Sequence, residues 1–465
     1  MSDIRRKFNS IKIAIGRTVW ILPVLLILPF SFSCEDPTSG KIENLAPQTY
    51  LSIFPDSTIA PGSTLITIRW WGDDPDGFIN GYRVSFDSVN WGYTTDNDST
   101  FALSINGSDS TFRFFVSAVD DQGLIDPTPA TNLYPVVNSA PAVTFEAGTE
   151  LPDTSFTIAS FKWIGSDPDG EENIASYLWS LNDTINFRRV PASITLLTLN
   201  SDSGIIANAN NVFYLRAVDE AGALSPIVRM PDTSRTWHVK AVTSKILMVR
   251  DIPSANLTTA TQYFANALDT ISYDMIDIKS NNGALIPKIV NPMWVETLGL
   301  FDVVFWVGGT GSVANAANFS LAQESLPYYL LGGGKVFFSS GFQGVGVSGQ
   351  GSLINFAPVD SVTSCTIPFI NITDSNLTQV DNSYPVIGSS SLITAVKGVY
   401  TQAQVIYTFF NGQGCTTSPI VVCFKDAPIN PRIVYMTLPV YFLNRDPNAS
   451  KVLFRRIFIG EFGIN

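Results

Sequence analysis

Residues 69–77 have the sequence RWWGDDPDG, and residues 162–170 repeat it as KWIGSDPDG. In both copies a turn sequence follows a tryptophan, and in this turn proline presets φ, aspartate bonds its own backbone and glycine accepts positive φ. A second matching pair lies downstream, AVDDQGL at 118–124 and AVDEAGAL at 217–224. The copies are about 95 residues apart, which fits one β-sandwich domain and not a solenoid repeat.

Apolar and polar residues alternate in the segments that lead into these turns. Ile66, Ile68 and Trp70 fall on one face of their segment, as a half-buried antiparallel strand requires. We therefore expect two successive sandwiches with Trp70 and Trp163 in equivalent buried positions.

The repeated pattern resembles the fibronectin type III-like and related immunoglobulin-like modules of bacterial surface proteins. The resemblance covers residues 45–240. It implies a first β-sandwich at 45–137 and a second at 138–242.

The acidic turns raise the question of a metal site, because calcium prefers clustered carboxylates. The candidate ligands are Asp73, Asp74 and Asp76 in the first copy and Asp167 and Asp169 in the second. An EF-hand loop needs further oxygens at fixed spacings and a bidentate glutamate, and these are missing. We expect a sharp, solvated turn and no metal.

The pattern changes after residue 242. Residues 245–251 form a continuous apolar run, typical of a strand buried on both faces, and a helix is expected at 258–268. Strands that alternate with helices predict a parallel sheet covered on both faces by helices, here over 243–465. The other expected strands span 273–278, 301–309, 335–341, 405–410, 420–424 and 433–438, and the other helices span 321–331 and 449–462.

This last region resembles the class I glutamine amidotransferase-like, flavodoxin-like fold, through Gly-Gly after Val307, YLLGGGKVFF at 329–338 and the strand at 433–435. The resemblance implies a three-layer α/β domain after two all-β sandwiches. Enzymes of that family carry a cysteine nucleophile after the strand matching 335–339, with a His-Glu pair. Here Ser339 and Ser340 stand there instead, and the only histidine is His238. We expect no catalytic residues.

Glycines and small polar residues follow two of the expected strands. These residues form either tight turns or a ligand-binding loop. The second is considered because open α/β sheets bind ligands at the carboxyl ends of their strands. The loop lacks the glycine and lysine spacing of the phosphate-binding motifs, so we expect no cofactor and favour a sugar or peptide. The candidate contacts are Gly308, Gly309, Thr310, Gly311, Ser312, Ser339, Ser340 and Gln343.

The N-terminus resembles a bacterial lipoprotein signal. Basic residues precede a short apolar run over 19–30 that is interrupted by prolines, and Ser31-Phe-Ser precedes Cys34. Leucine is commoner than serine at position 31 of such signals. The resemblance implies removal of 1–33, acylation of Cys34, a linker over 34–44 and a place in the bacterial outer membrane.

Composition supports an exported protein. Charged residues make up 15% of the 465 residues and the net charge is -12, which argues against nucleic acid as a partner. Cys423 lies in an apolar run and is expected in the core, whereas Cys365 and Cys415 are a candidate disulfide. The sequence has no Cys-x-x-Cys and no Cys/His pair for structural zinc.

Three functions fit these observations. The first is a lipid-anchored surface protein whose sandwiches form a stalk for a non-catalytic α/β head that binds a glycan or an envelope protein. The second is a hydrolase or transferase that acts on carbohydrate or peptide at the head. The third is an interaction subunit of an envelope secretion or motility assembly. The lack of a histidine near the candidate loop counts against the second.

Overall fold

The computed structural model contains two β-sandwiches and an α/β domain, which we call sandwich 1, sandwich 2 and the head. It describes residues 43–464 except 53–64, 104–109, 137, 170–172, 280–285, 311–316, 342–355, 364–366, 368–369, 374, 394–395 and 413–417. None of the helices within these ranges is both long and apolar enough to cross a lipid bilayer.

Sandwich 1 consists of a three-stranded and a four-stranded antiparallel sheet. Trp70 is 2% exposed and packs between the sheets, with its ring centroid 5.6 Å from that of Phe114. The first sheet has the order β1 (Gln48–Leu51), β2 (Leu65–Asp73), β5 (Asp98–Ala102), and the second has the order β4 (Gly92–Thr94), β3 (Ile79–Ser85), β6 (Ser110–Asp120), β7 (Ala130–Val136).

Sandwich 2 repeats this strand order and adds a small sheet. Trp163, 1% exposed, takes the place of Trp70, so the predicted equivalence of the two tryptophans is confirmed. Its sheets have the orders β8 (Ala142–Phe145), β10 (Ala159–Ser166), β13 (Leu196–Leu199) and β12 (Arg188–Pro191), β11 (Ile174–Leu181), β15 (Phe213–Asp219), β16 (Val228–Met230). The added sheet contains β14 (Ala209–Asn211), β17 (Trp237–Val239) and β9 (Thr154–Ser155), and a 3-10 turn spans Ser201–Ser203.

The head is built on a mixed sheet. Its parallel part has the order β19 (Asp274–Asp277), β18 (Ile246–Asp251), β20 (Val303–Thr310), β21 (Lys335–Gly341), β29 (Ile433–Met436). An antiparallel part continues it with β28 (Ile420–Lys425), β27 (Gln404–Phe409), β26 (Val399–Tyr400), β24 (Leu377–Gln379) and β22 (Ser361–Val362), and a separate pair holds β23 (Ile370–Asn371) and β25 (Leu392–Ile393).

The antiparallel part corrects the sequence prediction. The strands expected at 405–410 and 420–424 are present, but both run antiparallel to their neighbours, so the sheet is not parallel throughout. The physical reason lies in the connections. None of the described residues between β27 and β28, or between β28 and β29, is helical, and parallel neighbours need a long crossover.

Helices cover both faces of the parallel strands. On one face α1 (Ser254–Ala267) and α4 (Pro447–Arg455), which continues as a π-helix over Arg456–Glu461, pack on Met248 and Phe305. On the other face α2 (Val295–Leu298), after a π-helical turn at Val290–Trp294, and α3 (Ala317–Leu331) pack on Val249 and Trp306. Another 3-10 turn, Val440–Phe442, follows β29.

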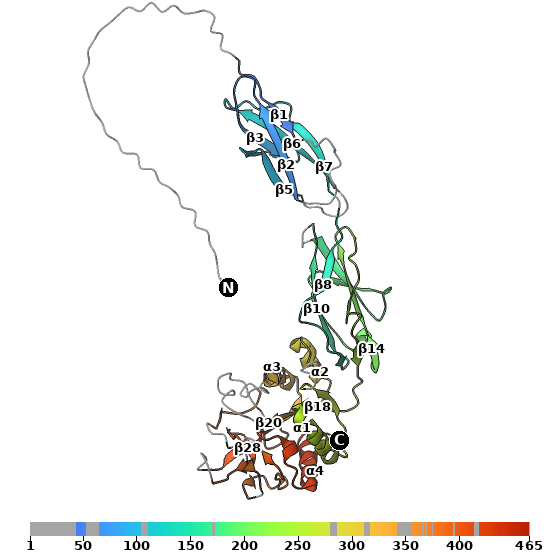
Figure 1. Ribbon diagram of the computed structural model, residues 1–465, viewed down its shortest axis with the longest axis vertical. Coiled ribbons are helices and arrows are strands. Elements are labelled where there is room, and N and C mark those ends of the chain that lie inside the picture. The colour runs from blue at the N-terminus through green and yellow to red at the C-terminus, as the bar shows by residue number, and fades with distance from the viewer. Residues whose placement is uncertain are drawn as a thin grey trace, which may run out of the picture.

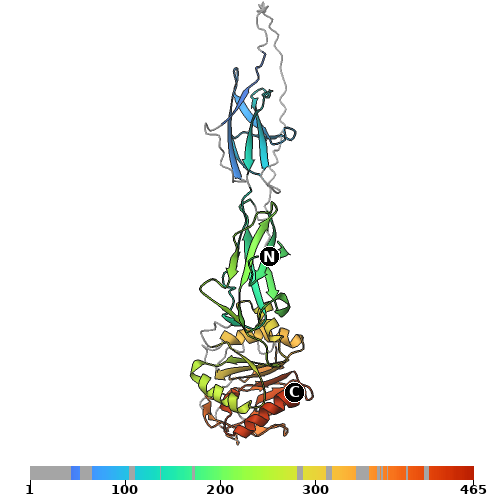
Figure 2. The ribbon, with the colours of Figure 1, turned by 90° about the vertical axis from the view of Figure 1, so that its right-hand side faces the viewer.

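The three bodies lie end to end (Figure 1). Sandwich 2 stands between sandwich 1 and the head, and the view turned by 90° shows the same line (Figure 2). The described chain enters sandwich 1 at the end that faces away from the head.

Sandwich 2 and the head share an apolar interface. The side chain of Phe156, 1% exposed, extends from sandwich 2 into the core of the head. Its ring packs edge to face on that of Phe301, with 5.1 Å between the ring centroids. Met293 of the head in turn joins the core of sandwich 2. Lys240 lies over the ring of Phe156 and donates a hydrogen bond of 3.3 Å to the carbonyl of Met275. The two bodies are therefore joined by more than the chain between them.

Candidate functional site

The expected ligand loop lies at the carboxyl edge of the head sheet, and its described part is tightly packed. A methyl group at Gly308 would collide with Oγ of Ser340, and one at Gly309 would lie 2.6 Å from Cδ of Pro253. Both glycines are thus explained by close approach of neighbouring atoms. Thr310 ends β20, whereas Gly311, Ser312 and Gln343 lie outside the described residues.

Ser339 is buried and serves the backbone. Its hydroxyl donates to the carbonyl of Leu438 at 2.8 Å and accepts from the amide of Val440 at 2.9 Å. These bonds connect β21 to the segment that follows β29. Ser340 is 9% exposed, and its Oγ is 3.5 Å from the carbonyl oxygen of Gly341. The Ser339 hydroxyl is committed to main-chain bonds, whereas a nucleophile needs a base as its partner.

His238 lies far from this edge in the fold. It belongs to β17 of sandwich 2, is exposed, and its Nδ1 is 3.2 Å from Oδ1 of Asn210. This strand lies near the end of the predicted second sandwich, shortly before the head begins. No contact in the described chain brings the imidazole to Ser339 or Ser340.

Two ion pairs at the carboxyl edge were missed by the sequence reasoning. Arg250 of β18 forms a bidentate pair with Asp277 of β19, and its Nη1 donates to Oγ1 of Thr261 at 2.9 Å. Lys279 lies 3.9 Å from Asp251. Because each charge has a partner of opposite sign, these side chains fix the edge of the sheet.

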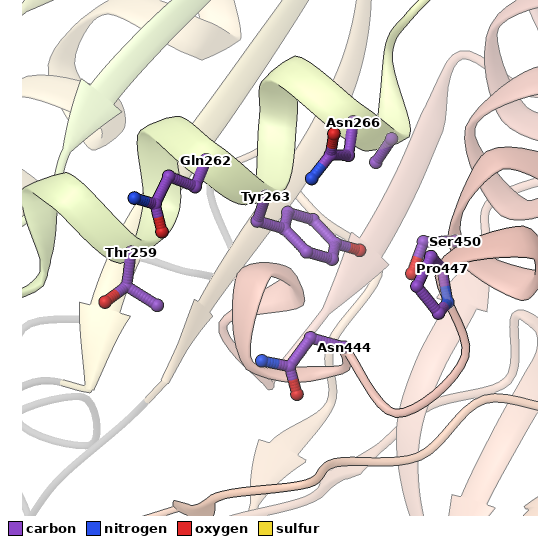
Figure 3. A pocket seen from close by; sticks show the side chains of 8 residues that line it. Thr259, Gln262, Tyr263, Asn266, Asn444, Pro447 and Ser450 are labelled. Carbon is purple, nitrogen blue, oxygen red and sulfur yellow. The ribbon is translucent and has the colours of Figure 1, made fainter.

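A polar groove lies between α1 and the start of α4 (Figure 3). Its cavity volume is about 200 Å³. Burial raises the pKa of Tyr263 in its wall. The groove offers neutral hydrogen-bonding groups and no nucleophile with a base, so it can hold a small neutral molecule but not drive hydrolysis. Its lining comprises Thr259, Gln262, Tyr263, Asn266, Ala267, Asn444, Pro447 and Ser450.

Buried charges form a further cluster under the C-terminal helix. Lys425 lies 2.9 Å from Glu461 and 3.5 Å from Asp381, and Arg456 lies 2.9 Å from the same Glu461 oxygen. The hydroxyl of Tyr384 donates to that oxygen at 3.0 Å. Two cations and two carboxylates balance, which is typical of a structural network.

The cysteines of the candidate disulfide, Cys365 and Cys415, and the lipidation residue Cys34 lie outside the described residues. Cys423 is buried in β28 as expected of a core residue, and burial raises the pKa of its thiol.

The solvated turn that we expected is present in sandwich 1 but not in sandwich 2. Asp167 and Asp169 are 8% and 5% exposed. In sandwich 1 Asp73 and Asp76 are exposed and Asp74 is half-buried, and Asp76 accepts a hydrogen bond from the amide of Leu45, in the segment that enters the module. No three His, Cys, Asp or Glu side chains in the described chain are grouped as a ready-made metal centre.

No protein-family model and no curated protein matches this chain. Solved structures similar to part of it are β-sandwich modules. The PKD1 domain of Vibrio anguillarum Epp is 17% identical, with 20% of this chain and 98% of that chain covered and a TM-score of 0.16. The fibronectin(III)-like modules of Clostridium thermocellum CbhA are 14% identical, with 42% and 95% covered and a TM-score of 0.18. A two-domain fibronectin type III segment of chicken tenascin is 16% identical, with 40% and 97% covered and a TM-score of 0.23.

The class of this protein follows from its own strand order. It is a multidomain chain with two fibronectin type III-like sandwiches, each pairing a three-stranded with a four-stranded sheet.

Proposed function

We propose that this chain is a lipid-anchored, non-catalytic protein of the bacterial cell envelope, in which two sandwiches carry an α/β head away from the membrane. The observation that carries the proposal is the end-to-end arrangement. The described chain, which begins at residue 43, enters sandwich 1 at the end that faces away from the head (Figure 1). An acylated Cys34 would therefore leave the head at the far end of the stalk.

The contact between sandwich 2 and the head supports this role. Phe156 and Met293 each lie in the core of the other body, so the head is held at a fixed angle on its support. A head that binds a partner at a distance from the membrane should bind it more tightly when its orientation is fixed, because less orientational freedom is lost on binding.

The proposed head is flavodoxin-like and related in fold to the class I glutamine amidotransferase-like domains. The strand order β19-β18-β20-β21-β29 supports this, because in chain order it is the 2-1-3-4-5 order of flavodoxin-like sheets. The hydrogen bonds of Ser339 support a non-catalytic head, because its hydroxyl is bonded to the main chain at Leu438 and Val440. The partner would be a glycan or an envelope protein at the outer membrane.

The test is fractionation of cells that express the wild-type chain or Cys34→Ser. The substitution should release the protein from the membrane fraction or leave its signal uncleaved, because the thiol is the site of acylation. A Cys34→Ser chain that stays membrane-bound with a mature-length N-terminus overturns the anchor. Pull-down of the intact protein from its own membranes would then identify what the head binds.

A further inference from the structure

In sandwich 1 the entering segment is held by one exposed carboxylate, that of Asp76, and one buried carboxylate, that of Asp120. Nδ2 of Asn44 donates to Oδ2 of Asp120 at 2.6 Å, and the amide of Leu45 donates to Oδ2 of Asp76 at 3.1 Å. Asp76 belongs to the Asp-Pro-Asp-Gly turn after β2, and Asp120 ends β6. Three separated parts of the chain therefore meet at this end of the module.

Sandwich 2 repeats the arrangement at its junction with sandwich 1. Nδ2 of Asn138 donates to Oδ2 of Asp219 at 2.6 Å, and the amide of Ser139 donates to Oδ2 of Asp169 at 2.6 Å. The entering segments also match, as Asn-Leu-Ala-Pro at 44–47 and Asn-Ser-Ala-Pro at 138–141. The second cluster lies directly after β7, the last strand of sandwich 1.

Carboxylate oxygens in both clusters are buried without a hydrogen bond. Asp169 is 5% exposed, and its Oδ1 accepts none from the residues that the structure describes. In sandwich 1 the same holds for both carboxylate oxygens of Asp74 and for Oδ1 of Asn44, under the same limits. Buried charges in proteins are paired or bind metal ions, so these oxygens point to a missing positive partner.

In sandwich 1 no basic side chain of the described residues supplies that partner. Within the described ranges, no Lys or Arg forms an ion pair with Asp74, Asp76 or Asp120. A methyl group on Gly77 would lie 2.6 Å from both Oδ2 of Asp74 and Oδ1 of Asp121, so these carboxylates approach one point.

We propose that each sandwich binds one calcium ion between its Asp-Pro-Asp-Gly turn and the asparagine segment that enters it. The carboxylates are Asp74 and Asp76 in sandwich 1, and Asp167 and Asp169 in sandwich 2. Oxygen ligands in a flexible set suit calcium, whereas zinc takes nitrogen or sulfur ligands.

The site is a weak one. Because no three carboxylates are grouped as a ready-made centre, the asparagine oxygen, main-chain carbonyls and water complete the coordination. A set with few charges places the dissociation constant at about 10⁻⁴ to 10⁻³ M, the range of extracellular modules. The ion in sandwich 2 crosslinks the segment between the sandwiches to the turn, so calcium stiffens the stalk.

Equilibrium dialysis of the full chain in detergent against radioactive calcium tests this. The wild-type chain should take up two ions, Asp76→Asn and Asp169→Asn one ion each, and the double variant none. Asparagine keeps an oxygen for the amides of Leu45 and Ser139. The matched control is Asp183→Asn, which removes one charge from an exposed turn of sandwich 2 and should leave uptake unchanged.

A second measurement needs no variant. Calcium at about 10 mM should raise the melting temperature of the wild-type chain more than sodium chloride of equal ionic strength, since ligand that binds only the folded state stabilises it. Absence of saturable uptake by the wild-type chain, or uptake unchanged in both Asp76→Asn and Asp169→Asn, overturns the proposal.

Discussion

Phe156 and Met293 each pack in the hydrophobic core of the neighbouring body. Phe156 comes from sandwich 2 and packs in the head, and Met293 comes from the head and packs in sandwich 2. Both are almost fully buried, at 1% and 2% exposure. The two bodies should consequently unfold together.

Phe156→Ala should make sandwich 2 and the head unfold in two separate transitions. Loss of a buried phenylalanine costs about 3–5 kcal/mol, and here the loss falls on the contact between the bodies. Differential scanning calorimetry should show one shared transition of sandwich 2 and head in the wild-type chain and two transitions in the variant. The control Ile185→Ala, whose side chain is 84% exposed in sandwich 2, should change neither. Separate transitions in the wild-type chain would contradict the shared interface.

Trp70→Ala and Trp163→Ala should each destabilise their own sandwich by about 3–5 kcal/mol, because each leaves a large cavity between two sheets. Denaturant titration followed by circular dichroism measures the loss. Trp71→Ala is the matched control, since Trp71 follows Trp70 in β2 but is 48% exposed. A near-neutral effect of either buried substitution would mean that the repeat does not define two equivalent cores.

Ser339→Ala should lower stability by about 1–3 kcal/mol, because the carbonyl of Leu438 and the amide of Val440 lose a buried partner. Ser340→Ala is the control and should cost less, since its hydroxyl has only a contact of 3.5 Å with Gly341. Fluorophosphonate and glutamine-analogue probes should not label the wild-type chain. Stoichiometric labelling of Ser339 or Ser340 would move the hydrolase hypothesis to first place.

Glu461→Ala should be strongly destabilising, by about 3–5 kcal/mol, because it leaves Lys425 buried without its closest carboxylate. The exposed Glu324→Ala in α3 serves as control. Thermal unfolding of both variants measures the difference. Equal melting temperatures would show that the buried network does not hold the C-terminal helix to β28.

The sequence predicted the parts of the fold that depend on local pattern. Alternation around Trp70, the repeated turns and the apolar run at 245–251 are each carried by neighbouring residues, so the sandwiches and the first strand of the head could be predicted. The antiparallel direction of β28 could not, because it depends on which strand lies beside β29 after folding.

Site residues were harder to predict for a similar reason. Ser339 bonds groups about a hundred residues away, and the partners of Asn44 and Asn138 lie 76 and 81 residues further along the chain. The sequence around Asp169 is typical of a solvated turn, but in the fold the entering segment covers this residue. One signal was present in the sequence. The matching Asn-x-Ala-Pro segments precede both repeats and mark the third part of each cluster.

The proposed anchor is tested most directly by the mass of the N-terminal peptide of the mature protein. The protein would be isolated from the membrane fraction of its own cells, digested and analysed by mass spectrometry. The account predicts a peptide that begins at Cys34 and carries the added mass of its acyl chains, since several chains together hold a protein firmly on a bilayer. A mature chain that begins elsewhere, or that carries an unmodified Cys34, would contradict it.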